Sequence, residues 1–313
     1  ACALDLARRF AADGDTEKTI LVIDKAEELG NHTLSGAVMD PAGIDALMPD
    51  WREKGFPILA EIQEDWAEML RPGGGSLPLR GMFCPPQLQN HGNLIVSLNQ
   101  IVRWLGERAE EAGIEVYGGF PAAELIREEN NRIGGVITRD SGIAKDGSKK
   151  ATYEPGMRIT ADVTVFAEGT RGSIAKELLS DATLGLMEGK NPQTYGTGIK
   201  ELWEVTPEVG AEFEGKVMHT GGYPLDLKSY GGSWVYGLPN NRLSLGFVVG
   251  LDHGDAALDA HALFVQWKQH PRIAKLIEGG KVVRYGAKTV PEGGLFSMPK
   301  LFGNGFVMVG DSA

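Results

Sequence analysis

The sequence has few cysteines, and this scarcity limits the sites that it can build. Only Cys2 and Cys84 occur among the 313 residues. Two separated thiols cannot hold a four-cysteine zinc ion or iron–sulfur cluster, and they cannot form a disulfide framework. A reducing compartment is therefore expected. The six histidines also lack the spacing of metal ligands, so no metal site is expected within this chain.

Basic charge and long apolar stretches are scarce as well. The chain has 31 lysines and arginines against 42 aspartates and glutamates, a net charge of −11. Because phosphates are bound by basic surfaces, this balance argues against a nucleic-acid-binding protein. The apolar stretches fall far short of the ~20 residues that span a bilayer, and no signal peptide is visible. The chain opens at Ala1 inside a helical pattern and stops just after a strand-like run, so both ends are expected to cut through a domain.

Glycine, by contrast, is abundant. The 43 glycines exceed the usual share of about 7%. An excess of glycine in a mixed sequence indicates tight turns and close approach of the backbone to a ligand. An apolar content of 42% and a charged content of 23% fit a globular protein, and the length favours two domains.

The first part of the chain has the order of a parallel α/β fold. Apolar spacing predicts a helix over residues 1–11 and then a fully buried parallel strand over 19–23, which ends at Asp24. Helix, buried strand and acid in this order form the second half of a βαβ unit. Another helix is expected from Ser97 to a stop at Gly113.

Shorter elements follow this helix. Strands are expected over 114–117, 124–128, 135–140 and 162–167. The polar segment 141–150 is interpreted as a hairpin loop and not as a functional basic patch.

From about residue 190 the pattern changes to antiparallel strands. Apolar residues at every second position over 243–249 predict a strand with one buried face, and 233–238 is its expected partner across a turn at 239–241. A helix over 261–269 should stop before Pro271. These elements predict a second domain that is rich in sheet.

Three strand ends carry an acid beside glycine or at the strand terminus. Asp24 could hydrogen-bond a ribose hydroxyl, and its alternative is a solvated strand end. The turns at Glu168-Gly169, with Arg171 nearby, and at Gly310-Asp311 could bring backbone close to a phosphate or a ribityl chain; the alternative for each is an ordinary turn. The order of the three signals is typical of flavoproteins of the glutathione-reductase and hydroxylase kind.

Several longer runs resemble the electron transfer flavoprotein–ubiquinone oxidoreductase family across essentially the whole chain. The runs that carry this resemblance are residues 32–37, 90–93, 193–203, 230–233, 246–252, 267–271, 279–281 and 285–287. The resemblance implies FAD, a four-iron cluster, electron transfer flavoprotein as the electron donor and ubiquinone as the acceptor. It also implies a monotopic position on an energy-transducing membrane, either a bacterial cytoplasmic membrane or a mitochondrial inner membrane.

The resemblance also gives the expected fold class, a mixed α/β protein. A Rossmann-like FAD-binding domain should take up 1–40, 88–180 and 296–313, and an interleaved antiparallel-sheet, ubiquinone-binding domain should take up 41–87 and 181–295. The family's glycine fingerprint would precede this chain and its cluster cysteines would follow it. No metal ligand is therefore expected here, and activity of this segment alone is doubtful.

The resemblance assigns roles to residues that the chain contains. The residues expected to contact FAD are Asp24, His32, Thr33, Leu34, Ser35, Gly36, Glu168, Gly169, Arg171, Gly310 and Asp311. Those expected at the quinone are Tyr230, Gly231, Gly232 and Ser233, with a glycine bulge in a strand as the alternative. Those expected at the membrane are Met82, Phe83, Leu295 and Phe296, with packing between domains as the alternative.

The resulting hypothesis is electron relay, and no acid–base residue is assigned. The protein would position the flavin and tune its potential, while the redox chemistry belongs to the cofactor. Two alternatives stay open: an FAD-dependent hydroxylase or prenyl reductase of the same fold, and a non-catalytic flavin-binding fragment.

Overall fold

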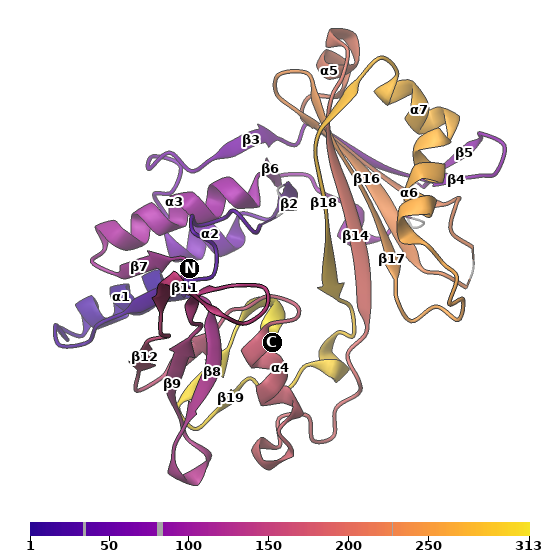
Figure 1. Ribbon diagram of the computed structural model, residues 1–313. Coiled ribbons are helices and arrows are strands. Elements are labelled where there is room, and N and C mark those ends of the chain that lie inside the picture. Colours follow the sequence, from indigo (N-terminus) through magenta and orange to yellow (C-terminus); the bar gives the residue numbers. More distant parts are fainter. Residues whose placement is uncertain (34–35, 80–83, 227) are drawn as a thin grey trace. The chain divides into compact units, whose positions relative to one another are not determined.

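The computed structural model describes residues 1–33, 36–79, 84–226 and 228–313 (Figure 1). The chain forms two compact units, each built from three separate segments. Unit 1 consists of Ala1–Lys18, Gly30–Gly113 and Gly196–Lys288, and unit 2 consists of Thr19–Leu29, Ile114–Tyr195 and Thr289–Ala313.

A seven-stranded sheet dominates unit 1. Its strands, in spatial order, are β18 (Lys281–Pro291), β14 (Tyr195–Glu204), β17 (Arg242–Gly250), β16 (Gly231–Leu238), β15 (Lys216–Gly222), β4 (Glu64–Leu70) and β5 (Ser76–Leu79). β14, β17, β16 and β15 pair antiparallel in succession, and β15 pairs parallel with β4. The β16–β17 turn contains Asn240 and Asn241 with φ values of 62° and 53°, which short polar side chains tolerate.

One face of this sheet is buried by helices. In β17, Leu243, Leu245, Phe247 and Val249 are each at most 1% exposed, because alternate residues of a strand point to the same face. They pack with buried residues of α6 (Ala260–Gln269) and α7 (Pro271–Ile277), which lie beside β16 and β17 in Figure 1. We call this the helix face of the sheet.

The opposite face packs partly against a small sheet of the order β2-β6-β3 (Ala37–Met39, Leu94–Val96, Ile58–Glu61). Val38, Ile95 and Leu59 meet Val217 and Tyr236 of the large sheet in one apolar cluster. We call this the open face. The remaining helices of unit 1 are α1 (Cys2–Ala12), α2 (Ala42–Leu47), α3 (Leu98–Glu111) and α5 (Pro207–Phe213).

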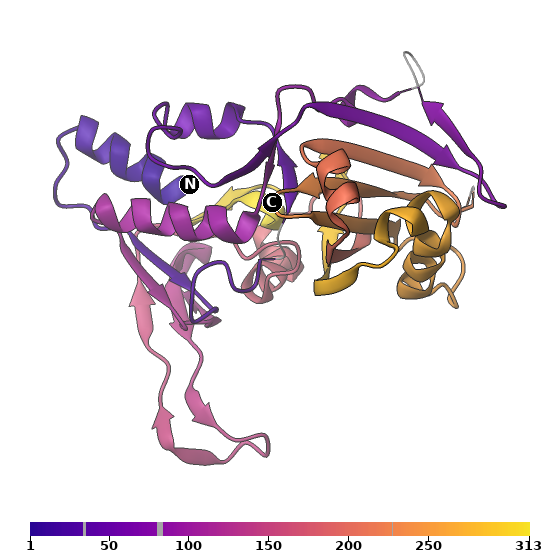
Figure 2. The same cartoon turned by 90° about the horizontal axis from the view of Figure 1, so that it is seen from above.

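Unit 2 contains two parallel strand pairs. β1 (Leu21–Asp24) pairs with β7 (Glu115–Gly118), and β13 (Thr164–Phe166) pairs with β20 (Phe306–Met308), which also pairs antiparallel with β19 (Phe302–Gly303). The other elements are β8 (Ala122–Arg127), β9 (Ile133–Thr138), β12 (Arg158–Thr160) and α4 (Ser173–Ser180). A hairpin of β10 (Ser141–Ile143) and β11 (Lys149–Glu154) extends from this unit, as the pink ribbon of Figure 2 shows.

The sequence predictions for elements are largely confirmed. Helices α1, α3 and α6 and the β8–β9 and β16–β17 pairs lie where the apolar spacing placed them. The strand ending at Asp24 is parallel but not fully buried, since Leu21 is 41% exposed. Helix α7 was not anticipated because Pro271 was interpreted only as a stop, whereas it occupies the first turn of a new helix. The boundaries of the two functional domains stay a prediction.

Candidate functional site

Two turns in unit 2 meet at the carboxyl ends of parallel strands. The first follows β13 and contains Gly169 and Thr170; the second follows β20 and contains Asp311 and Ser312. The Ser312 hydroxyl donates to the Gly169 carbonyl at 3.1 Å, and the Thr170 hydroxyl donates to an Asp311 carboxylate oxygen at 3.2 Å. The structure therefore brings together two motifs that lie about 140 residues apart in the sequence.

Both turns leave backbone accessible. Gly169 and Gly310 adopt φ values of +79° and +64°, and a methyl group built on either would meet no atom within 4 Å. Glycine at such positions has no steric cost, and open space above it lets a ligand approach the backbone closely. Ligands of α/β folds bind at the carboxyl ends of parallel strands, so this pair of turns fits the approach of a phosphate or ribityl chain of FAD.

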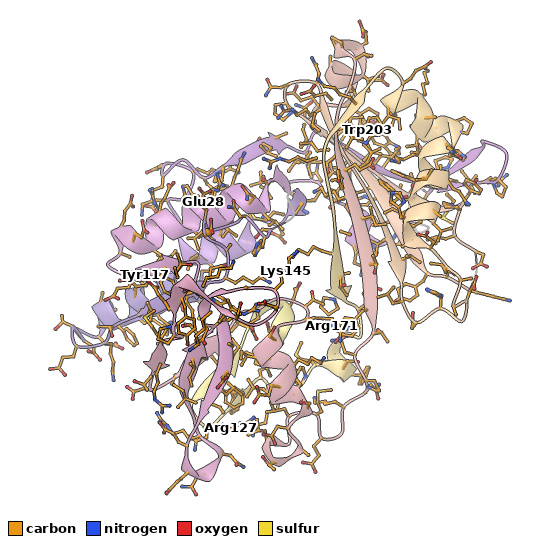
Figure 3. All side chains as sticks on the ribbon, in the orientation of Figure 1. Glu28, Tyr117, Arg127, Lys145, Arg171 and Trp203 are labelled. Atoms are coloured by element: carbon orange, nitrogen blue, oxygen red, sulfur yellow. The ribbon has the colours of Figure 1, made fainter. Side chains whose placement is uncertain are left out.

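Glu168 has a structural role in this turn. Its carboxylate accepts the backbone N–H groups of Ile174 and Ala175 at 3.3 and 2.6 Å, which caps the start of α4. Any contact of this turn with a cofactor would therefore come from the neighbouring backbone. Arg171 lies on the loop between β13 and α4 (Figure 3), and its guanidinium carbon is 5.3 Å from the Tyr195 ring centroid.

The other expected cofactor residues are less well connected. Asp24 ends β1, and its carboxylate accepts the Ala26 N–H at 2.7 Å. Within the described ranges, no hydrogen bond joins Asp24 to the Gly169 or Asp311 turn. His32 is exposed, and Thr33 is half-buried. Leu34 and Ser35 lie outside the described residues, whereas Gly36 immediately precedes β2 in unit 1.

The expected quinone residues begin strand β16 and alternate between its two faces. Tyr230, Gly232 and Trp234 belong to the open face, whereas Ser233 belongs to the helix face. The Ser233 and Thr220 hydroxyls are 2.5 Å apart, and Trp267 of α6 donates to Thr220. A quinone contact from Ser233 would therefore involve its backbone and not its side chain.

The two glycines of this strand are there for different reasons. The β16–β17 register runs from Gly231 to Leu238 without a shift, so the alternative of a glycine bulge is wrong. A methyl group on Gly231 would lie 2.1 Å from the Val248 carbonyl oxygen, so packing requires glycine there. At Gly232 the nearest atom would be the Thr220 carbonyl oxygen at 3.4 Å, so the fold itself does not require glycine at that position.

Gly232 belongs to a strip of small residues across the open face. Gly198 pairs with Val248, Val248 pairs with Gly232, and Gly221 continues the row on β15. The next row along the strands contains Lys200, Gly246, Trp234 and His219. We call the first row the glycine strip; Val248 is its one branched residue, and the Met69 side chain lies over Gly221 at its end.

The structure reveals a buried polar cluster beside this strip that the sequence analysis did not single out. Lys200 is 7% exposed, and its ammonium group donates to the Gly36 carbonyl at 2.7 Å. Burial lowers the pKa of Lys200 to about 7. Among the described residues, buried polar atoms without a hydrogen-bond partner include His219 Nδ1, Trp234 Nε1 and Ser244 Oγ, all on this face. Such atoms indicate a ligand or ordered water. The signal in the sequence is a lysine at a position of β14 that shares a face with Gly198 and Leu202.

The expected membrane residues are only partly described. Met82 and Phe83 lie outside the described residues. Leu295 and Phe296 begin a short 3₁₀ helix in unit 2 and are 71% and 75% exposed, so they do not fill an apolar core within that unit. Across the described ranges, no helix has the length and apolar character to cross a bilayer, and no group of side chains is arranged to bind a metal ion.

Comparisons with known proteins identify relatives of the large sheet and of nearly the whole chain. The family described as "ETF-QO, ubiquinone-binding" matches residues 195–290, which contain β14 to β17 and the glycine strip of those strands. Electron transfer flavoprotein–ubiquinone oxidoreductases described as mitochondrial are similar over nearly the whole chain. The protein of Dictyostelium discoideum is 44% identical over 94% of this chain, that of Oryza sativa is 39% identical over 98%, and that of Homo sapiens is 41% identical over 97%.

Over its length, the chain belongs to the electron transfer flavoprotein–ubiquinone oxidoreductase family. It spans about half the length of these relatives, covering 47%, 52% and 49% of them respectively.

Solved structures confirm the mixed α/β fold class. A geranylgeranyl bacteriochlorophyll reductase-like protein of Thermoplasma acidophilum matches with a TM-score of 0.66 at 15% identity, covering 99% of this chain and 68% of that one. A myxobacterial FAD-dependent halogenase matches with a TM-score of 0.59 at 17% identity, covering 99% and 65%. At these identities the likeness establishes the fold alone.

The lowered pKa of Lys200 predicts a specific dependence of stability on pH. Between about pH 7 and the ordinary lysine value of 10.5, the unfolded chain binds one proton more than the folded chain, so the free energy of unfolding should rise with pH. Each unit of difference between the two pKa values corresponds to about 1.4 kcal/mol. Denaturant unfolding of the wild type and Lys200→Met across this range measures the effect.

The variant should lack the rise that the wild type shows. Lys216→Met is the matched control, because Lys216 lies on the same sheet in a partly exposed ion pair with Glu64. Parallel pH curves for the wild type and Lys200→Met would contradict the prediction.

Proposed function

We propose that this chain forms part of an oxidoreductase that passes electrons from reduced electron transfer flavoprotein, through FAD, to ubiquinone. The observation that carries the proposal is the match of the ubiquinone-binding family to residues 195–290, the region that contains Gly232 and the buried Lys200. The oxidation of fatty acids and amino acids would supply electrons to the respiratory chain by this route. A four-iron cluster would be held by residues other than the described ones.

FAD would be held mainly by backbone. The turns at Gly169 and Gly310 supply accessible N–H and C=O groups. The hydrogen bonds from Ser312 and Thr170 hold the two turns side by side. Asp24 would accept a ribose hydroxyl. The cofactor supplies the redox chemistry, whereas the chain's residues bind and orient it.

The quinone ring would lie on the glycine strip. Gly232 has no side chain of its own and lies between two aromatic residues, Tyr230 just before β16 and Trp234 within it, which suits a flat ring. The backbone of Gly231 and Gly232 would hydrogen-bond the quinone oxygens.

The membrane surface would supply the quinone. Leu295 and Phe296 are exposed apolar residues without a covering partner in unit 2, and burying one such side chain contributes about 1.5–3 kcal/mol. Since the relatives are described as mitochondrial, we infer a monotopic position on the mitochondrial inner membrane, with the bacterial cytoplasmic membrane as the alternative.

The proposal is tested with the full-length protein that carries this segment. Reduced electron transfer flavoprotein and a water-soluble ubiquinone are mixed with it, and oxidation of the flavoprotein is followed. Quinone-dependent oxidation is expected, and its absence would reject the proposal. A hydroxylase or prenyl reductase would instead consume an aromatic or prenyl substrate, and a preparation without the yellow flavin spectrum would support a non-catalytic role.

Gly310→Ala should weaken FAD binding. An added methyl group would occupy the open space above the turn, and we expect a loss of about tenfold in affinity, or about 1.4 kcal/mol. The flavin retained after gel filtration is the measurement. Gly14→Ala is a matched control, because Gly14 has a similar φ of +70° and similar open space in a turn after α1. Equal flavin retention in the two variants would exclude Gly310 from the site.

Gly232→Leu should impair quinone reduction by about 10- to 100-fold while FAD stays bound, because the added side chain would occupy the surface on which the quinone ring is proposed to lie. Turnover with ubiquinone is compared with turnover with ferricyanide, a small acceptor that does not need the strip. Gly75→Leu, at the β4–β5 turn, is the control, as a methyl group built on Gly75 meets no atom within 4 Å. Unchanged ubiquinone kinetics would remove Gly232 from the proposal.

Phe296→Glu should reduce binding to liposomes about tenfold or more, because a charge replaces an apolar side chain that is 75% exposed. Cosedimentation with vesicles is the measurement. Tyr117→Glu charges another exposed aromatic residue of unit 2, at 48% exposure, and should leave binding intact. If Phe296→Glu binds as well as the wild type, Phe296 does not contact the membrane.

A further inference from the structure

Lys200 occupies an unusual place on the open face. It lies at the middle of β14, opposite Gly246 of β17, and Gly246 in turn lies opposite Trp234 of β16. The Trp234 ring fills the space above Gly246, since a methyl group there would lie 1.9 Å from a ring carbon. The row that contains Lys200 therefore directly borders the glycine strip.

The ammonium group of Lys200 is also held in one place. It donates to the Gly36 carbonyl at 2.7 Å, and a methyl group on Gly36 would lie 2.1 Å from the lysine nitrogen. Gly198, a member of the glycine strip, is two residues from Lys200 on the same strand, a separation of about 6.6 Å between Cα atoms. In the described structure the ammonium lies next to Gly36 and near Ser244 Oγ, on the side of its row away from the strip. A lysine side chain is long enough to turn toward a ring on the strip once it releases the Gly36 carbonyl.

We propose that Lys200 is a catalytic residue that protonates one oxygen of the quinone while the quinone is reduced. This inference rests on the proposed function. Reduction of a quinone to a quinol takes two electrons, supplied by the reduced flavoprotein through the protein's redox cofactors, and two protons. At one oxygen a new O–H bond forms as a lysine N–H bond breaks, which leaves Lys200 neutral. Solvent protonates the other oxygen and then restores the ammonium.

The surroundings of Lys200 support this role. Its pKa of about 7 lets it give up and regain a proton near neutral pH, as a general acid must. On the same face, burial lowers the pKa of His219, and it raises that of Tyr236 well above its ordinary value. Asp65 lies at the far side of this face, opposite Val217. The small sheet packed here contributes no titratable residue from β2 or β6 and the exposed Glu61 from β3, and Lys288 lies on the neighbouring β18.

The experiment compares two electron acceptors in the full-length protein across pH. Ubiquinone reduction needs protons, whereas ferricyanide reduction does not. In the wild type, quinone turnover should fall as pH rises through about 7, and ferricyanide turnover should not. Lys200→Met should lose about 10²- to 10⁴-fold of quinone turnover together with this pH dependence, and keep its ferricyanide turnover.

Two further variants separate proton transfer from a structural role. Lys200→Arg keeps a charged donor for the Gly36 carbonyl but cannot release its proton, so it should not rescue quinone turnover. Lys216→Met should behave as the wild type. Quinone binding, followed by quenching of tryptophan fluorescence near Trp234, should stay within a few-fold of the wild type in Lys200→Met.

The outcomes separate the two claims. If the wild type shows no quinone turnover, the proposed function fails, whatever Lys200 does. If the wild type is active but Lys200→Met keeps its rate and pH profile, or Lys200→Arg is fully active, the assignment of Lys200 is wrong. If Lys200→Met does not fold, the pH dependence of quinone turnover in the wild type tests the assignment. A quinone rate that does not change with pH near 7 would overturn it.

Discussion

Burial of one face of the seven-stranded sheet is the constraint on which the rest of unit 1 depends. The apolar residues of β17 and the helices α6 and α7 fix which residues of every strand point inward. Because the side-chain period of a strand is two, this choice places Gly232, Trp234 and Lys200 together on the opposite face. If the register of β14 shifted by one residue, Lys200 would lie on the helix face among apolar side chains. Burying its charge there without a partner would be costly.

Unit 2 reaches its candidate site in a different way. Its cofactor turns follow short parallel strands and depend on backbone conformation more than on side-chain chemistry. In the turn after β13, the Glu168 side chain stabilises the start of α4, whereas the backbone of Gly169 stays accessible to a ligand. Positive φ values and hydrogen bonds between the turns provide a rigid edge, which suits a cofactor that supplies its own chemistry.

Much of the fold was accessible from the sequence, and part of the site was not. Local periodicity placed α3, β16 and β17, because their apolar spacing reflects a single buried face. It misjudged the burial of β1, which depends on neighbours far away in the sequence. The same limit applies to Lys200, whose contact with Gly36 spans 164 residues, and to Ser233, whose face is set by the register with β17. The family resemblance pointed to the strand proposed for the quinone but could not say which of its side chains lie on the open face.

The link between the two glycine turns has a consequence for how the protein is made. Gly169 and Ser312 are separated by 143 positions, so a ribosome must finish β20 before the hydrogen bond between them can form. Until then the turn after β13 lacks the neighbour that orders it. Capture of the cofactor at this edge is therefore expected only after β20 has left the ribosome, however early β13 and its turn are made.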